Sequence, residues 1–531
     1  MRANPCRPLR ALFLLLATLL GGGFLAAQDD EAKLEALKEF RKYFPTYREV
    51  AQQREAVFAL KGQETVDAAQ ELVRLLEHRV PEVREAVLEV LGTYSDPRTF
   101  APFLAELPKE KNAARRANLV EVFARAKVKE ALPLLRAFAS DKNVDAATKH
   151  QVARALQVLG TSTDVDTREA LAALLAHADP MVRVAAVDTT GSLRVKELGE
   201  ALVPLLDDAT WQVQASAIQA VAKIRVQSAI DPLIAIMKKG GRLQQDAGVA
   251  LERITALEFG FDTAAWEQQV AKLKSLGWRI PTDEELEKAA QAKAVSDKRY
   301  GRTPAPGAAQ FAQIQTTSTQ ILFIIDISGS MEDLVVEREK FQGYDDYSKF
   351  AIVRTELLRA IDSLQPNSNF NIVAFATELH PWKKTLVPAN VINKDAARSW
   401  VRRLKPLGGK ESQELAQAGL TASANIGAGK TNTYTALLSA FGVDPDKAPS
   451  GPSTGGQSVA ARNRLDTVYF LSDGRPSTGK LVDTGEILKA ITELNRSYKM
   501  VIHTIAIGEF QKEFLKDLAA HNGGVFVDLG R

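Results

Sequence analysis

The chain has 531 residues, of which 45% are hydrophobic and 25% are charged. These fractions are ordinary for globular proteins and exclude a disordered chain, a collagen and a polytopic membrane protein, and the length corresponds to about three or four domain-sized units. The formal net charge is +3, but Arg2, Arg7 and Arg10 all lie in the first ten positions. Without them, basic and acidic residues are equal in number, which argues against nucleic-acid binding because that requires a basic surface.

Residues 1–27 have the pattern of a secretory signal peptide. A basic start precedes an apolar run at 11–20, and the small residues Ala26 and Ala27 precede an acidic segment. The alternative is an uncleaved N-terminal anchor, although the run is shorter than the ~20 residues of a membrane span. We expect a secreted, periplasmic or cell-envelope protein with no membrane span after cleavage. The only cysteine, Cys6, lies in this leader, so the mature chain would have no disulfide and would depend on core burial.

Residues 28–281 are predicted to form an all-α solenoid with helical caps. Helical segments end at intervals of roughly 30 to 35 residues, at Leu91, Ala124, Leu159, Leu193, Ile224 and Ile254. The turns within the units often carry Asp or Pro followed by Val-Arg-x-Ala, as at 81–86 and 179–185, and the Asp is expected to cap the second helix. These units resemble short HEAT repeats, which bury their apolar faces only by stacking.

Two segments bound the end of this array. The aromatic residues of 259–281, including Trp266, are expected to cover the open core of the last repeat. Residues 282–318 are predicted to be a linker, because a charged helical start gives way to a segment rich in Pro, Gly, Ala and Gln at 301–312.

Residues 319–531 alternate between apolar β-type runs and helical segments. The strands are expected at 319–325, 370–375, 467–471, 501–507 and 525–527, and the helices at 349–364, 396–404, 434–441, 485–498 and 512–521. This order indicates an α/β doubly wound, mostly parallel, Rossmann-like sheet. The whole chain is therefore predicted to be multidomain, and the site is expected at the carboxyl ends of the strands.

Three segments at that edge carry oxygen ligands. They contribute Asp326, Ser328 and Ser330 after the first strand, Thr431 before a helix, and Asp473 after the 467–471 strand. Carboxylates, hydroxyls and waters are hard ligands that suit Mg²⁺ or Mn²⁺ and are unattractive to Zn²⁺. Alternation in Asp-x-Ser-x-Ser places its three side chains on one side of an extended loop.

In these residues the chain resembles the von Willebrand factor A family over about residues 319–531. The family's metal-ion-dependent adhesion site has Asp-x-Ser-x-Ser, then Thr, then Asp, in this order. The resemblance implies that the serines bind the metal directly, that Thr431 binds directly or through water, and that the two aspartates bind largely through water. An open position on the metal would then accept a partner's carboxylate. The alternative is a metal-free loop in which Ser328 and Ser330 only cap the turn.

Two insertions depart from a minimal domain of this kind. Glu332–Tyr347 follows the metal loop, and its acidic and aromatic residues either contact a partner or form a solvated loop. Val443–Arg464 is rich in Pro, Gly and Ser and is expected to be a mobile loop.

Other chemistries fit the sequence less well. Gly427–Thr431 is similar to the end of a phosphate-binding loop, but Ala424 stands where that motif requires Gly, so no nucleotide is expected. His503 lies in an apolar strand and is expected to be a hydrogen-bonded core residue. The six histidines are scattered and suggest no zinc site. No His stands in a recognisable relation to Ser328 as a nucleophile, so we expect no enzyme.

The sequence therefore predicts an exported, non-enzymatic adhesion protein. A divalent-cation site, with Mg²⁺ or Mn²⁺, would engage a protein partner that has an exposed Asp or Glu, and the solenoid would serve as a scaffold. The alternative is a structural protein of the cell envelope in which the metal site closes an internal or homo-oligomeric contact. A metal-assisted hydrolase is a third class, but it lacks a visible general base.

Overall fold

The computed structural model describes residues 33–279 and 309–529, except 312–313, 337, 342–343, 345, 410–413, 415–416, 418–425, 444–463 and 509–511; between 280 and 308 it describes only 281–282, 284–285 and 287–288. The predicted leader, the segment 301–308 and most of the predicted mobile loop lie outside the described residues. None of the helices that are described is both long and apolar enough to cross a membrane.

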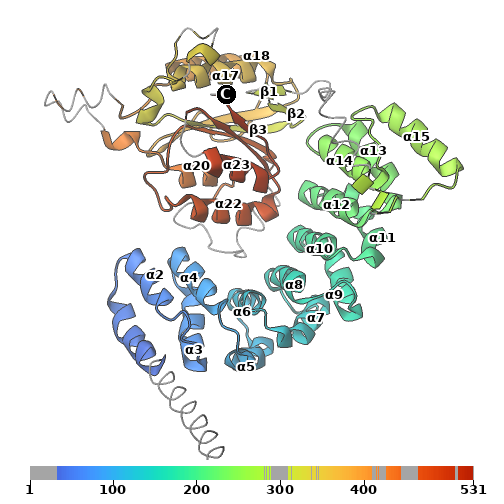
Figure 1. The fold of residues 1–531 in the computed structure, drawn as a ribbon, viewed down its shortest axis with the longest axis vertical. Helices are drawn as coiled ribbons and strands as arrows, with labels where there is room; N and C mark the ends of the chain where they lie inside the picture. Colours follow the sequence, from blue (N-terminus) through green and yellow to red (C-terminus); the bar gives the residue numbers. More distant parts are fainter. Residues whose placement is uncertain are drawn as a thin grey trace, which may run out of the picture. The chain divides into compact units, whose positions relative to one another are not determined.

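The chain divides into two compact units, residues 1–161 and 162–531, and this division falls inside the repeat region. The helices of the first unit are α2 (Val50–Phe58), α3 (Val66–Arg74), α4 (Pro81–Leu91), α5 (Pro97–Glu106), α6 (Ala113–Arg125), α7 (Leu132–Ser140) and α8 (Ala146–Leu159) (Figure 1). The repeat helices of the second are α9 (Val165–Leu175), α10 (Pro180–Leu193), α11 (Gly199–Leu202), α12 (Trp211–Ile224), α13 (Ile230–Lys239), α14 (Leu243–Thr255) and α15 (Thr263–Ser275). The second helix of each repeat ends within one residue of its predicted last residue. These helices are α4, α6, α8, α10, α12 and α14.

The Asp and Arg residues of the repeat turns stabilise the helix starts. Asp179 caps α10 by accepting a hydrogen bond from the amide of Met181 at 2.7 Å. Four residues further on, Arg183 Nη1 donates to the carbonyl of His177 at 2.8 Å. Arg84 holds the equivalent position of α4 and donates to the carbonyl of His78. The Val-Arg pattern therefore marks an arginine that satisfies a carbonyl of the preceding turn.

Trp266 is the buried centre of the aromatic segment after the repeats. Trp266 of α15 is fully buried, and its indole N–H donates to the carbonyl of Gly260 at 3.1 Å. Its ring lies edge-on to Phe259, with centroids 5.0 Å apart.

The second unit also contains the sheet, with strand order β5-β4-β3-β7-β8-β9. Five strands run parallel, namely β3 (Gln320–Asp326), β4 (Asn369–Phe375), β7 (Thr467–Ser472), β8 (Val501–Ala506) and β9 (Phe526–Asp528). The short strands β5 (Leu379–Pro381) and β6 (Val387–Pro388) pair antiparallel with β4. Part of the predicted linker is instead a hairpin of β1 (Ala309–Phe311) and β2 (Ile314–Thr316), and Ile314 is buried in the core.

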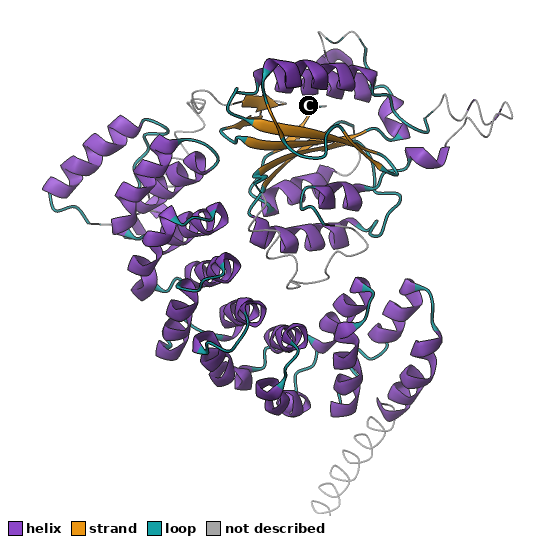
Figure 2. Cartoon of the chain, turned by 180° about the vertical axis from the view of Figure 1, so that it is seen from behind, coloured by secondary structure: helices purple, strands orange, loops and turns teal. Residues whose placement is uncertain are grey.

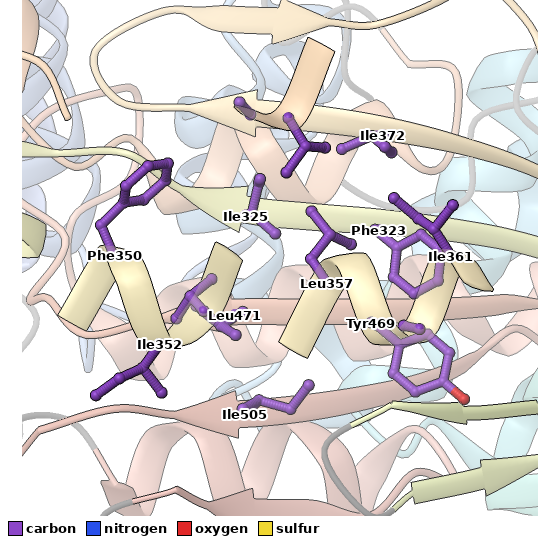
Figure 3. Close-up of a cluster of buried hydrophobic side chains, with 14 of the residues drawn as sticks. Phe323, Ile325, Phe350, Ile352, Leu357, Ile361, Ile372, Tyr469, Leu471 and Ile505 are labelled. Carbon is purple, nitrogen blue, oxygen red and sulfur yellow. The ribbon is translucent and has the colours of Figure 1, made fainter. Parts of the chain in front are cut away.

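Helices cover both faces of the sheet (Figures 1 and 2). One face carries α17 (Lys349–Ser363) and α18 (Val391–Arg403), and the other carries α20 (Thr433–Ser439), α22 (Thr484–Tyr498) and α23 (Lys512–His521). Alternate residues of β3 enter the two cores. Phe323 and Ile325 pack with Leu357 of α17 (Figure 3), whereas Leu322 and Ile324 belong to the cluster on the opposite face. The sheet is thus buried on both faces, as its continuous apolar runs predict.

The strand order places the topological switch point of the sheet at β3. The chain leaves β3 for β4 on one side and later returns to β7 on the other side. Loops from neighbouring strands therefore diverge at the carboxyl ends of β3 and β7, which is where ligands bind in open α/β sheets.

Inside the second unit, repeat helices contact the sheet domain away from that edge. Lys499, which follows α22, forms an ion pair with Asp188 of α10 at 2.7 Å. Thr317, just before β3, donates to the carbonyl of Gly241 at 2.8 Å. Both contacts lie near the amino ends of β8 and β3.

Candidate metal centre

Asp326 is the last residue of β3 and is fully buried. Its Oδ1 accepts a hydrogen bond from the amide of Ser328 at 2.8 Å, and its Oδ2 accepts one from the hydroxyl of Ser472 at 2.6 Å. Burial raises the pKa of the Asp326 carboxyl above its usual range, and the charge of Asp473 raises it further. A cation at this position would therefore stabilise the ionised form of the carboxyl group.

The serines of the same loop connect it to the β7 loop. The hydroxyl oxygens of Ser328 and Ser330 are 3.3 Å apart. The hydroxyl of Ser330 donates to Asp473 Oδ1 at 2.9 Å. This contact joins residues that lie 143 positions apart in the chain.

Thr431 reaches the site from the segment before α20. Its amide donates to the hydroxyl of Ser477 at 2.9 Å, and its carbonyl accepts from the Ser477 amide at 2.9 Å. A Cβ atom on Gly474 would lie 3.2 Å from Thr431 Oγ1 and 3.5 Å from Ser330 Oγ. The hydroxyls of Thr431 and Ser330 therefore approach the same point beside the β7 loop. The structure thus brings all five predicted residues together, while their role as metal ligands stays a prediction.

A glycine in the metal loop permits a close backbone crossing. A Cβ atom on Gly329 would lie 2.9 Å from the carbonyl oxygen of Gly408. The adjacent Leu407 amide donates to the carbonyl of Ile327 at 2.8 Å. The segment that follows α18 therefore fixes the metal loop, and a larger residue at 329 would push the two backbones apart.

Sequence reasoning missed two residues of this site, Lys349 and Ser472. Lys349 Nζ lies 2.6 Å from Asp473 Oδ2, and Ser472 is the donor to Asp326 described above. The sequence contains one indication of the role of Lys349. A lysine at the first position of a helix is disfavoured by the helix dipole, so its charge is expected to be compensated by another group. The sequence contains no such indication for Ser472, since its role depends on β7 lying beside β3.

The insertion after the metal loop is less solvated than the solvated-loop interpretation implies. Phe341 is buried, and its ring contacts Tyr344 with centroids 6.0 Å apart. Tyr344 in turn donates to Glu356 of α17 at 2.8 Å. Among the described residues of this segment, Leu334 and Val336 are large apolar side chains that are exposed.

The donor set fits a hard divalent cation. In the part of the chain that the structure describes, no three His, Cys, Asp or Glu side chains gather as a metal site. A cation here would therefore be held by hydroxyls together with the carboxylates of Asp326 and Asp473. Such oxygen ligands suit Mg²⁺ or Mn²⁺.

His503 is a core residue, as predicted. It is buried in β8, its Nδ1 accepts the amide hydrogen of Val525 at 3.0 Å, and its ring stacks on Tyr469 with centroids 4.9 Å apart. Burial, and then the charge of Arg242, lower the pKa of His503 to about 3, so the ring is neutral.

Two family models match the chain. Residues 48–124 and 167–252 match HEAT repeats, and residues 347–528 match a von Willebrand factor type A domain. The second match begins after the loop of Asp326, although β3, which carries that residue, pairs with β4 and β7 in the same sheet.

Several relatives resemble the C-terminal part. Inter-alpha-trypsin inhibitor heavy chain H1 of Sus scrofa is 27% identical over 205 residues, which are 38% of this chain and 18% of that protein. Heavy chain H4 of Homo sapiens is 31% identical over 218 residues, or 40% and 18% of the two chains. The chain thus spans less than a fifth of the length of these relatives. Among solved structures, BatB from Bacteroides thetaiotaomicron is 13% identical with a TM-score of 0.25, and the match covers 40% of this chain and 90% of that one.

Proposed function

The chain combines HEAT repeats with a von Willebrand factor type A domain, and we propose that it is an exported, non-enzymatic protein that captures a protein partner through a divalent cation. The observation that carries this proposal is the meeting of Ser328, Ser330 and Thr431 with two carboxylates at the carboxyl ends of β3 and β7. Relatives named as heavy chains of a trypsin inhibitor support a binding role rather than catalysis. No nucleotide or nucleic acid enters this proposal.

The protein's own contacts explain how such a site would favour a carboxylate. Each oxygen of Asp326 and of Asp473 already accepts a hydrogen bond or ion pair from the protein. The carboxylates are therefore partly neutralised, and the other three donors are uncharged hydroxyls. A Mg²⁺ or Mn²⁺ ion held there would supply a positive centre for an Asp or Glu of the partner.

The repeats would act as the scaffold. Inside the second unit they contact the sheet domain at Lys499 and Thr317, near the amino ends of β8 and β3. Closure of an internal or homo-oligomeric contact in the cell envelope is the alternative function.

The test is capture on the immobilised processed chain, in Mg²⁺ and in EDTA. Cell-envelope extract should yield a protein that is retained in Mg²⁺ and released by EDTA. Replacement of the critical Asp of that partner by Asn should weaken binding by several kcal/mol, because the charge that faces the cation is lost. Equal capture in both buffers would refute the mechanism, and capture of a second copy of this chain would favour the self-assembly alternative.

Thr431→Ala is the discriminating variant. By the family resemblance Thr431 contributes most to the ligand-bound arrangement, so the variant should weaken partner capture more than Mg²⁺ binding itself. Calorimetry with MgCl₂ and surface plasmon resonance with the partner measure the two effects separately. An equal loss in both assays would mean that Thr431 only holds the metal.

A further inference from the structure

A lysine occupies one wall of the candidate metal centre. Lys349 is the first residue of α17, and its ammonium lies 2.6 Å from Asp473 Oδ2. The side chain of Lys349 is 11% exposed and that of Asp473 is 0% exposed. The pair is therefore nearly removed from solvent, where a charge is retained only if it is well paired.

Local forces do not favour a cation at this position. The amino end of a helix carries a partial positive charge, which disfavours a lysine in the first turn. The helix start is already capped, because the hydroxyl of Ser348 accepts from the amide of Ala351 at 3.3 Å. Lys349 is thus not needed to begin the helix, and its charge is compensated by the carboxylates of the metal centre.

The lysine is also packed in place. A Cβ atom on Gly508, which follows β8, would lie 3.4 Å from Lys349 Cε and 3.6 Å from its Nζ. Gly508 has a φ of +114°, a conformation in which L side chains are strained. The lysine side chain therefore lies in van der Waals range of residue 508, where the backbone conformation favours glycine.

The charges of the site suggest what this lysine does. The site contains two acidic side chains, Asp326 and Asp473. Lys349 places one positive charge beside Asp473, the carboxylate that would also contact the divalent ion. An ammonium and a divalent ion within a few ångströms repel each other, and the repulsion is larger in a buried site than in water. Both cations would also draw on the same carboxylate, Asp473.

We propose that Lys349 is a resident cation of the metal centre, which competes with the divalent ion for Asp473 and keeps divalent-ion binding weak. This inference rests on the proposed metal site. It assigns Lys349 as a positioning residue that acts through Asp473.

The experiment measures Mg²⁺ binding by calorimetry on the full processed chain and its variants. Lys349→Met should bind Mg²⁺ about tenfold more tightly or better, because the repulsion is removed. Lys349→Gln retains an N–H donor for Asp473 without the charge, and it should show the same gain if charge is the cause. Circular dichroism and thermal melting establish that both variants are folded.

Lys499→Met is the matched control. Lys499 pairs with Asp188 at 2.7 Å, and its side chain is 12% exposed, so the two lysines are alike in partner and burial. The control should leave Mg²⁺ affinity unchanged within about twofold, since the pair lies near the amino ends of the strands.

The outcomes separate this inference from the proposed function. Tighter Mg²⁺ binding in both Lys349 variants supports the inference. If the variants bind Mg²⁺ but the natural chain binds it too weakly to detect, the inference holds and the metal-dependent function fails. Equal or weaker binding in folded Lys349→Met and Lys349→Gln would overturn the inference and leave the metal site intact. If no variant binds Mg²⁺ or Mn²⁺, both proposals are wrong.

Discussion

The repeat helices use polar side chains on their own first turn or on the neighbouring helices of the array, whereas the sheet domain gathers polar side chains from distant segments at one edge. Asp179 and Arg183 both act on the turn that begins their own helix. In contrast, Asp326 is contacted by Ser472, which lies 146 positions away. The repeats therefore use charge to define helix ends and to join neighbouring segments of the array, as Arg183 does with Asp208. The sheet domain instead concentrates charge where a ligand can compensate it.

Matched carboxylates in the two regions give the largest expected difference. Asp326→Ala should abolish the stabilisation by Mg²⁺, which amounts to about 2.7 kcal/mol at a hundredfold excess over Kd. Asp145→Ala, in the repeats, removes the cap that accepts from the Thr148 amide at 2.9 Å and also the ion pair with Arg116. It should lower stability by about 2 kcal/mol while leaving the Mg²⁺ shift intact.

Thermal melting with and without Mg²⁺, alongside far-UV circular dichroism, measures both effects. A retained Mg²⁺ shift in Asp326→Ala would place the metal elsewhere. Loss of the Mg²⁺-induced shift in melting temperature in Asp145→Ala would contradict the contrast between the two regions, because a carboxylate of the repeats would then influence the metal centre.

A buried ion pair of the repeats should matter for stability alone. Arg183 donates to both oxygens of Asp208 at 2.9 and 2.8 Å, and the two side chains are only 15% and 8% exposed. Arg183→Met would leave the Asp208 charge buried and unpaired, which should cost about 3 kcal/mol.

The control for that change is Lys239→Met. Lys239 pairs with Asp207 at 3.0 Å, but the side chains are 70% and 85% exposed, so the loss should be under about 1 kcal/mol. Urea denaturation followed by circular dichroism compares the variants. Similar midpoints for the two would mean that burial of the Arg183 pair contributes nothing to stability.

The same contrast explains which parts of the fold follow from the sequence. Helix ends in the repeats are encoded locally by apolar spacing and caps, and the predicted ends agree with the structure to within one residue. The long strands β3, β4, β7 and β8 were also predicted, because continuous apolar runs identify strands that are buried on both faces. The strands β1, β2, β5 and β6 were missed because they have only two or three residues and no continuous apolar run. The equally short β9 was predicted from the apolar run at 525–527.

The site divides in the same way. The five predicted residues were found through the order of a family motif, and the structure brings them together. Lys349 and Ser472 were missed because their contacts depend on which strands lie side by side and on where α17 begins. Sequence spacing alone does not contain that information.

His503 tests how the sheet domain tolerates isolated buried groups. Arg242 faces the ring, as does the stacked Tyr469, and burial raises the pKa of nearby Asp466 to about 6. The pKa of His503 is about 3 in the fold, against roughly 6.5 when unfolded. Between these values the unfolded state binds more protons, so the contribution of His503 to stability is lost as the pH falls through this window.

His503→Asn should therefore reduce the loss of stability at low pH. An Asn side-chain oxygen can replace Nδ1 as the acceptor of the Val525 amide without titrating. At pH 5, about 1.5 units below the unfolded pKa, the natural chain should lose about 2 kcal/mol that the variant retains. Asp466 has the opposite sign, because its raised pKa favours the folded state as the pH falls from about 6, and it contributes equally to both chains. Urea midpoints at pH 5 and pH 7.5 give the difference, and parallel pH profiles for the two chains would show that the histidine is protonated without cost in the fold.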